Sequence, residues 1–162
     1  MDVDNAEYNE WVPAGALVKG LFAMISLLIV LVTFVVLLFS EEPFAEEIIG
    51  LGFSWGILAF LLFVFWNFRG LRIRINSAIL SVDYGLFNKK SFLLKEIISC
   101  KKTKAFGRYY GIGVRYGIDG SIAYTTSFAN AVEIAPTQGR VFVFSSKNAD
   151  KVCETINQRK PT

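Results

Sequence analysis

Hydrophobic residues form two long uninterrupted runs in the first part of the chain. Residues 20–39 and 48–68 contain no charged side chain. At the rise of an α-helix, the second run spans roughly 31 Å, which matches the hydrocarbon core of a bilayer. We therefore predict two transmembrane helices, at about 14–39 and 48–68.

The segment between the two runs is short and acidic. Residues 40–47 read SEEPFAEE, and the proline in this segment cannot continue a helix. The segment is too short to cross a bilayer, so the two helices are expected to form an antiparallel hairpin. Residues 1–13 lack the positively charged region of a signal peptide. We interpret them as an acidic leader, with Trp11 in the lipid headgroup layer.

After the second run, apolar residues recur at every second position. Leu71, Ile73 and Ile75 alternate with Arg72 and Arg74, which is typical of a strand with one buried face. Turn-forming residues separate several such runs. We predict strands at 71–75, 79–82, 92–94, 97–104, 111–116, 121–125, 131–135 and 140–145. Short strands at this spacing are typical of a small sandwich or barrel.

The end of the chain changes to a helical period. Ala149, Val152, Cys153 and Ile156 recur at intervals of three and four residues, with polar residues between them. This pattern predicts a short amphipathic helix. Its apolar stripe is expected to pack on the strands before it.

Several motifs in this part resemble the end of bacterial pleckstrin-homology-like domains. They are Gly113–Arg115, Tyr124, Val132–Ile134, Gly139, Val141–Ser146 and Ala149–Ile156. The resemblance covers about Leu71–Asn157, and two preceding membrane helices are common in that family. It implies a mostly-β domain at 69–159, with about seven strands and a C-terminal helix, and no shared catalytic residues. An OB-like barrel behind the same hairpin is the alternative architecture.

Basic residues are concentrated after the second hydrophobic run. Of the 17 Lys and Arg residues, only Lys19 precedes Arg69, and residues 40–47 contain none. Positive charges next to a membrane helix remain on the cytoplasmic side. Arg69, Arg72 and Arg74 therefore predict a multi-pass protein of the cell (inner) membrane. Both of its termini would be cytoplasmic.

The same cations are the candidate binding residues. Arg69, Arg72 and Arg74 directly follow the second helix and are predicted to contact anionic headgroups of the inner leaflet. Alternatively, they only fix the orientation of the chain. A wider basic surface is expected from Lys89, Lys90, Lys101, Lys102, Lys104 and Arg108. No recognisable module with paired stacking aromatics accompanies these cations, so nucleic acid is not expected as a partner.

Two glycines mark a possible contact between helices. Gly52 and Gly56 lie four positions apart in the second hydrophobic run, and small residues at this spacing allow close approach of helices in lipid. We expect the second helix to pack there against the first helix. Contact with another copy of the chain is the alternative.

The composition excludes several classes of chemistry. The chain has no histidine and two cysteines, Cys100 and Cys153, which excludes histidine acid–base catalysis and multi-ligand Cys/His zinc sites. We see no catalytic carboxylate pair and no metal-ligand spacing. We predict no catalytic residue, no metal and no cofactor. In a cytoplasmic domain, the cysteines are expected to be buried apolar groups rather than a disulfide.

Together, these patterns predict a non-enzymatic, membrane-anchored interaction module on the cytoplasmic face. Its expected partners are membrane lipids and either another protein or a second copy of the chain. Two alternatives remain open: a small accessory subunit of a larger membrane complex, and a domain that senses anionic lipid.

Overall fold

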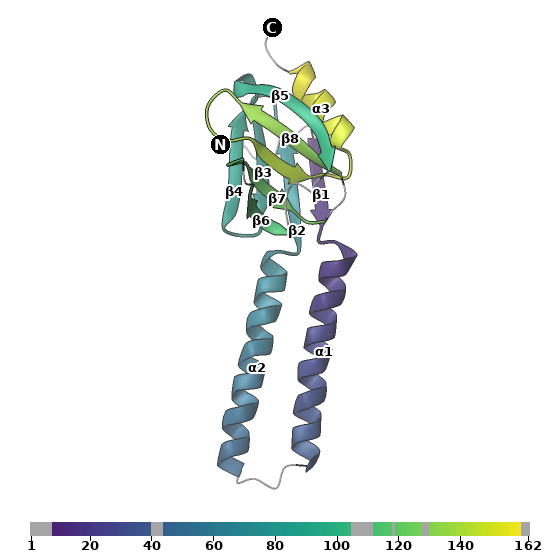
Figure 1. Cartoon of the computed structure of the whole chain (residues 1–162), viewed down its shortest axis with the longest axis vertical. Helices are drawn as coiled ribbons and strands as arrows, with labels where there is room; N and C mark the ends of the chain where they lie inside the picture. Colours follow the sequence, from purple (N-terminus) through teal and green to yellow (C-terminus); the bar gives the residue numbers. More distant parts are fainter. Residues whose placement is uncertain (1–7, 40–43, 105–111, 118, 128–129, 160–162) are drawn as a thin grey trace. The chain divides into compact units, whose positions relative to one another are not determined.

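The computed structural model describes residues 8–39, 44–104, 112–117, 119–127 and 130–159. The chain forms two units: a pair of long helices within Gly15–Asn67, and a β domain (Figure 1). The β domain combines residues that precede Gly15 with residues that follow Asn67. It therefore extends beyond the expected range 69–159, and the helix pair is an insertion within it.

The two predicted apolar helices are confirmed as α1, Ala16–Phe39, and α2, Phe44–Asn67. They pack against each other near the start of α1 and the end of α2, where the rings of Phe22 and Phe65 lie 5.0 Å apart. Both helices are long and apolar enough to cross a membrane, and only 6% of the most apolar window of each is buried. Most of their large apolar side chains therefore face outward.

Four antiparallel strands form the first sheet in the order β1-β2-β3-β4. Their bounds are β1 Tyr8–Pro13, β2 Gly70–Ile75, β3 Ile79–Tyr84 and β4 Asn88–Leu93. Residues 8–13, expected to be part of a polar leader, instead form β1 and pair with β2 along their whole length. Burial of Tyr8 and Val12 holds this edge strand on the core.

Five strands form the second sheet in the order β5-β8-β9-β7-β6. Their bounds are β5 Ile97–Lys104, β6 Gly113–Tyr116, β7 Ile122–Thr125, β8 Asn130–Pro136 and β9 Phe142–Ser145. These strands confirm the predicted series, although β7 and β9 are parallel. The strand expected at 92–94 begins earlier, at Asn88, so Lys89 and Lys90 lie within β4.

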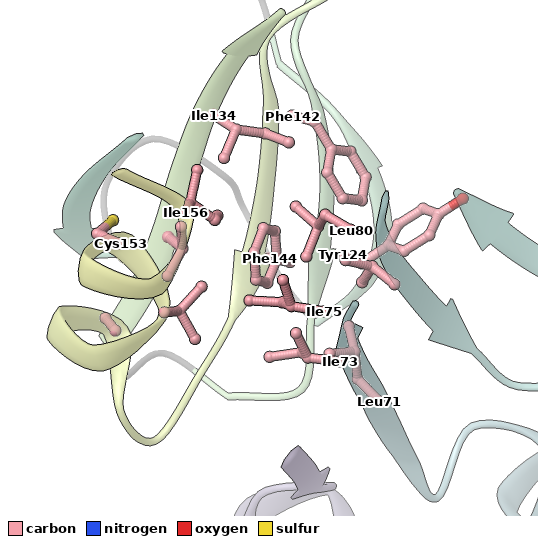
Figure 2. Packing of buried hydrophobic residues seen from close by; sticks show 14 of the residues in the cluster. Leu71, Ile73, Ile75, Leu80, Tyr124, Ile134, Phe142, Phe144, Cys153 and Ile156 are labelled. Atoms are coloured by element: carbon pink, nitrogen blue, oxygen red, sulfur yellow. The ribbon is translucent and has the colours of Figure 1, made fainter. Parts of the chain in front are cut away.

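The core lies between the two sheets and the C-terminal helix α3, Ala149–Gln158. Figure 2 shows side chains from β2, β8, β9 and α3 pointing toward one another, among them Ile73, Ile134, Phe144 and Ile156. The four apolar residues of the predicted amphipathic stripe, Ala149 to Ile156, are all buried. The prediction of a terminal helix that covers the sheets is therefore confirmed.

A disulfide joins Cys100 in β5 to Cys153 in α3, with the two Cα atoms 5.4 Å apart. The expectation of two unbonded cysteines is wrong. The periodic pattern correctly placed Cys153 on the buried face of α3, but only the packing of α3 on β5 brings Cys100 opposite to it. A second link between these elements is an ion pair, in which Nζ of Lys102 lies 2.5 Å from Oδ2 of Asp150.

Candidate juxtamembrane surface

The strands that flank the inserted helices are bonded to each other up to the point where the helices begin. Pro13 pairs with Gly70, and the amide of Ala14 donates a hydrogen bond to the carbonyl of Arg69 at 2.7 Å. Two residues separate β1 from α1, and two separate α2 from β2. Both connections therefore leave the first sheet at one end, where Pro13 faces Gly70, which we call the junction end.

An exposed indole lies at the junction end. Trp11 is 41% exposed, and its six-membered ring lies so close to Gly70 that a β-carbon there would collide with it. The guanidinium carbons of Arg69 and Arg72 lie 6.0 and 5.8 Å from the ring centroid of Trp11. These are cation–π distances. Glycine at position 70 therefore allows one aromatic side chain to associate with two cations.

The strand register aligns further charges beside this cluster. Trp11, Arg72, Asp83 and Lys89 lie opposite one another across β1 to β4. Successive side chains of a strand point to opposite faces, and the register partners of Arg72 share its face. The outer face of the first sheet therefore carries these four residues together with Arg74. This face brings together three of the predicted basic residues: Arg72, Arg74 and Lys89.

Arg74 differs from the other two arginines near the junction end. Its guanidinium forms an ion pair with the carboxylate of Asp83, and both side chains are mostly covered. Arg69 and Arg72 are exposed. The predicted lipid contact is therefore geometrically open to Arg69 and Arg72, whereas Arg74 is engaged within the sheet.

The wider basic surface is divided between two sheet edges. Lys89 and Lys90 lie on β4, the edge of the first sheet, whereas Lys101, Lys102 and Lys104 lie on β5, the edge of the second. Lysines on an edge strand hinder pairing with another chain. This role explains their position without a ligand. Arg108 lies outside the described residues.

A buried carboxylate fastens β1 to the C-terminal part of the domain. Glu10 accepts hydrogen bonds from the Tyr8 hydroxyl at 2.8 Å, the Ser146 hydroxyl at 2.7 Å and the Lys147 amide at 2.6 Å. Burial, together with the hydrogen bond and negative charge of Glu10, raises the pKa of Tyr8 above its usual range. The sequence interpretation missed this role because Glu10 resembled one acid of a solvated leader.

Gly52 and Gly56 do not pack on α1. A β-carbon added at either glycine meets no described atom within 4 Å. The expected packing of these glycines against the first helix is therefore wrong. The contact between α2 and α1 includes the ring of Phe65 instead, which lies 5.0 Å from the ring of Phe22.

Within the described residues, no group of three or more Cys, Asp or Glu side chains is placed to hold a metal ion. Comparison of the chain with protein-family models, with curated proteins and with solved structures finds no match. The functional interpretation therefore depends on the geometry of the helix pair and the junction end.

Proposed function

We propose that the protein is a non-enzymatic interaction module anchored in a membrane by α1 and α2. The observation that carries this proposal is the pairing of β1 with β2 across the inserted helices. Each connection contains two residues and can extend by about 7 Å at most. Two such short connections hold the β domain at the bilayer surface, where it can present the remaining faces of its sheets to a partner.

The β domain is proposed to be pleckstrin-homology-like and to lie on the cytoplasmic side. Its two sheets and terminal helix are compatible with a pleckstrin-homology-like fold. Arg69, Arg72 and Arg74 support a cytoplasmic location, because cations beside a membrane helix favour the cytoplasmic face.

The disulfide between Cys100 and Cys153 favours the opposite side of the membrane, because disulfides persist mainly in oxidising compartments. Labelling decides between the two sides. Ser77 lies exposed in the turn between β2 and β3. A Ser77→Cys chain should react with a membrane-impermeant maleimide only after the cells are permeabilised. Reaction in intact cells would place the domain outside and overturn the cytoplasmic assignment.

The interaction role is tested with the full chain. Alkaline carbonate should leave the protein in the membrane pellet, and extraction by carbonate would contradict the anchor. Capture from mild detergent, followed by mass spectrometry and light scattering, should then give a self-oligomer or a reproducible partner. Recovery as a single protomer without a partner would contradict the interaction module.

The open face at Gly52 and Gly56 favours a second candidate, an accessory subunit whose helices pack inside a larger membrane complex. Gly52→Leu with Gly56→Leu should then release the chain from the complex. Gly20→Leu in α1 is the matched control, because Gly20 also has no described atom within 4 Å of an added β-carbon. Equal behaviour of the two variants would count against this candidate.

A further inference from the structure

The turn between β3 and β4 exposes two adjacent large apolar side chains. Leu86 is 52% exposed and Phe87 is 76% exposed. Gly85 adopts a positive φ of 73°, which allows the chain to reverse just before them. Turns in water-facing domains are usually built from polar residues, Gly and Pro. A Leu–Phe pair is therefore unusual for a turn that faces water.

The strand register places this turn at the junction end. Leu71 pairs with Tyr84, and Tyr84 pairs with Asn88. Gly70, which immediately precedes Leu71, marks the junction end. Because β3 runs back toward that end, the turn at 85–87 projects from the same end of the sheet as the two connections to α1 and α2.

Cations and an indole lie next to this apolar turn. Arg72, Asp83 and Lys89 share one row across the sheet, and Trp11 completes that row beside Arg69. Arg72 lies two positions beyond Gly70, or roughly 7 Å along the strand, within the reach of an arginine side chain. The apolar turn lies at the very end of the sheet, and the indole and the cations lie slightly further from that end. This order matches a bilayer surface, where acyl chains lie below the phosphates.

We infer that the junction end of the first sheet docks on the bilayer that holds α1 and α2. Leu86 and Phe87 enter the boundary of the acyl chains, while Arg69 and Arg72 contact lipid phosphates. This inference rests on the proposed membrane anchor. It deepens the expected contact of Arg69 and Arg72 with anionic lipid and adds two residues, Leu86 and Phe87, that the sequence patterns did not single out.

Depth measurements on the full chain test the apolar contact. Phe87→Cys is labelled with an environment-sensitive fluorophore, and the chain is reconstituted in nanodiscs. Ser77→Cys is the matched control, because its turn lies at the opposite end of the same sheet. The chain without an added cysteine is the labelling blank, since Cys100 and Cys153 are bonded. Nitroxide lipids should quench the label at position 87 strongly and the label at 77 weakly. Equal quenching would overturn the inference.

Lipid titration tests the arginines. In detergent, phosphatidylglycerol should bind the Arg69→Gln/Arg72→Gln variant about thirty-fold more weakly than the unsubstituted chain. Lys101→Gln/Lys104→Gln loses the same charge on the edge of the second sheet and should bind like the unsubstituted chain. Equal loss in both variants would indicate only net charge and would overturn the site.

Two further measurements distinguish failure of the lipid site from failure of the membrane anchor. Phosphatidylcholine should bind weakly, and excess inorganic phosphate should not displace phosphatidylglycerol. Displacement would indicate a site for a free anion and overturn the lipid assignment. If carbonate extracts the chain from membranes, the proposed function fails. If the chain stays embedded but Phe87 remains in water, only the docking inference fails.

Discussion

The helix pair and the β domain place the same residue types in opposite environments. In α1 and α2, side chains such as Leu27, Phe34 and Phe60 are exposed, whereas in the first sheet Leu71 and Ile73 are completely buried. Hydrophobic burial in water can explain only the second pattern. The two units therefore differ in where their apolar side chains lie: those of the helices mostly face outward, whereas those of the first sheet's core are covered.

The two units meet in the sequence at the junction end. There the helices are inserted between two paired strands, β1 and β2, rather than attached to one end of a complete domain. Tyr8 and Val12 precede the helices in the sequence, and they complete a hydrophobic core whose other residues follow the helices. If the β domain is an ordinary water-soluble fold, it should keep its structure in a chain that lacks the two helices.

The largest effect is expected from separating β1 from the rest of the domain. Replacing residues 15–67 with a short Gly/Ser linker should give a soluble, folded chain, because Ala14 and Arg69 are already hydrogen-bonded. Residues 68–162 alone should be largely unfolded. Burial of Tyr8 and Val12 contributes about 3–6 kcal/mol, a large part of a typical total of about 5–15 kcal/mol. Urea unfolding followed by circular dichroism compares the two chains, and equal stability would contradict the role of β1.

The next largest effect concerns the disulfide. It closes a loop with a sequence separation of 53, so its removal should lower the free energy of unfolding by about 4 kcal/mol in the chain-entropy model. Cys100→Ala/Cys153→Ala in the linker chain should match the unsubstituted linker chain under reducing conditions. A reductant that leaves the stability of the unsubstituted linker chain unchanged would show that the bond does not form in solution.

A smaller loss is expected from Glu10→Gln. The carboxylate accepts three hydrogen bonds, and an amide in its place would turn one acceptor into a donor. We expect a loss of about 2–3 kcal/mol in the free energy of unfolding. Glu96→Gln, at an exposed position, is the control and should change stability by less than about 0.5 kcal/mol. Equal effects would mean that Glu10 does not fasten β1.

A loss of stability similar in size to that of Glu10→Gln is expected at alkaline pH. Burial raises the pKa of Tyr84 from 10.0 to about 12, so the fold favours its neutral hydroxyl. The stabilisation is complete below pH 10 and falls by about 2–3 kcal/mol as the pH rises toward 12. Tyr84→Phe keeps the ring against Phe68 and should lose less stability over this range. Some loss should remain, because burial also raises the pKa of Tyr124. An unchanged slope would contradict the assignment to Tyr84.

Local periodicity predicted much of the fold. Uninterrupted apolar runs indicated α1 and α2, alternation indicated β2, and the spacing of Ala149 to Ile156 indicated α3, because each signal lies within one element. The strand at Tyr8–Pro13 was missed because Glu10 interrupts its apolar alternation. That carboxylate is acceptable in the interior because Tyr8 donates a hydrogen bond to it from the same strand, and Ser146 and Lys147 donate two more from a distant part of the chain.

The candidate site was predicted only in part. Arg69 and Arg72 followed from their position after a predicted membrane helix, and the sequence also suggested an interfacial role for Trp11. Pairing of Arg74 with Asp83 depends on strand register, which the spacing of residues does not specify. The same register brings Leu86 and Phe87 to the junction end, so no local pattern could assign them a role.

Side-chain patterns along the chain were enough to show which segments avoid water, which alternate between two environments and where positive charge accumulates. These properties depend on side-chain polarity and on the fixed periods of helix and strand. Three features became visible only in the folded chain: β1 completes a domain interrupted by two helices, Cys100 meets Cys153, and the Leu86–Phe87 turn lies beside the arginines. These facts depend on contacts between distant residues, which arise when sheets pair and a core closes.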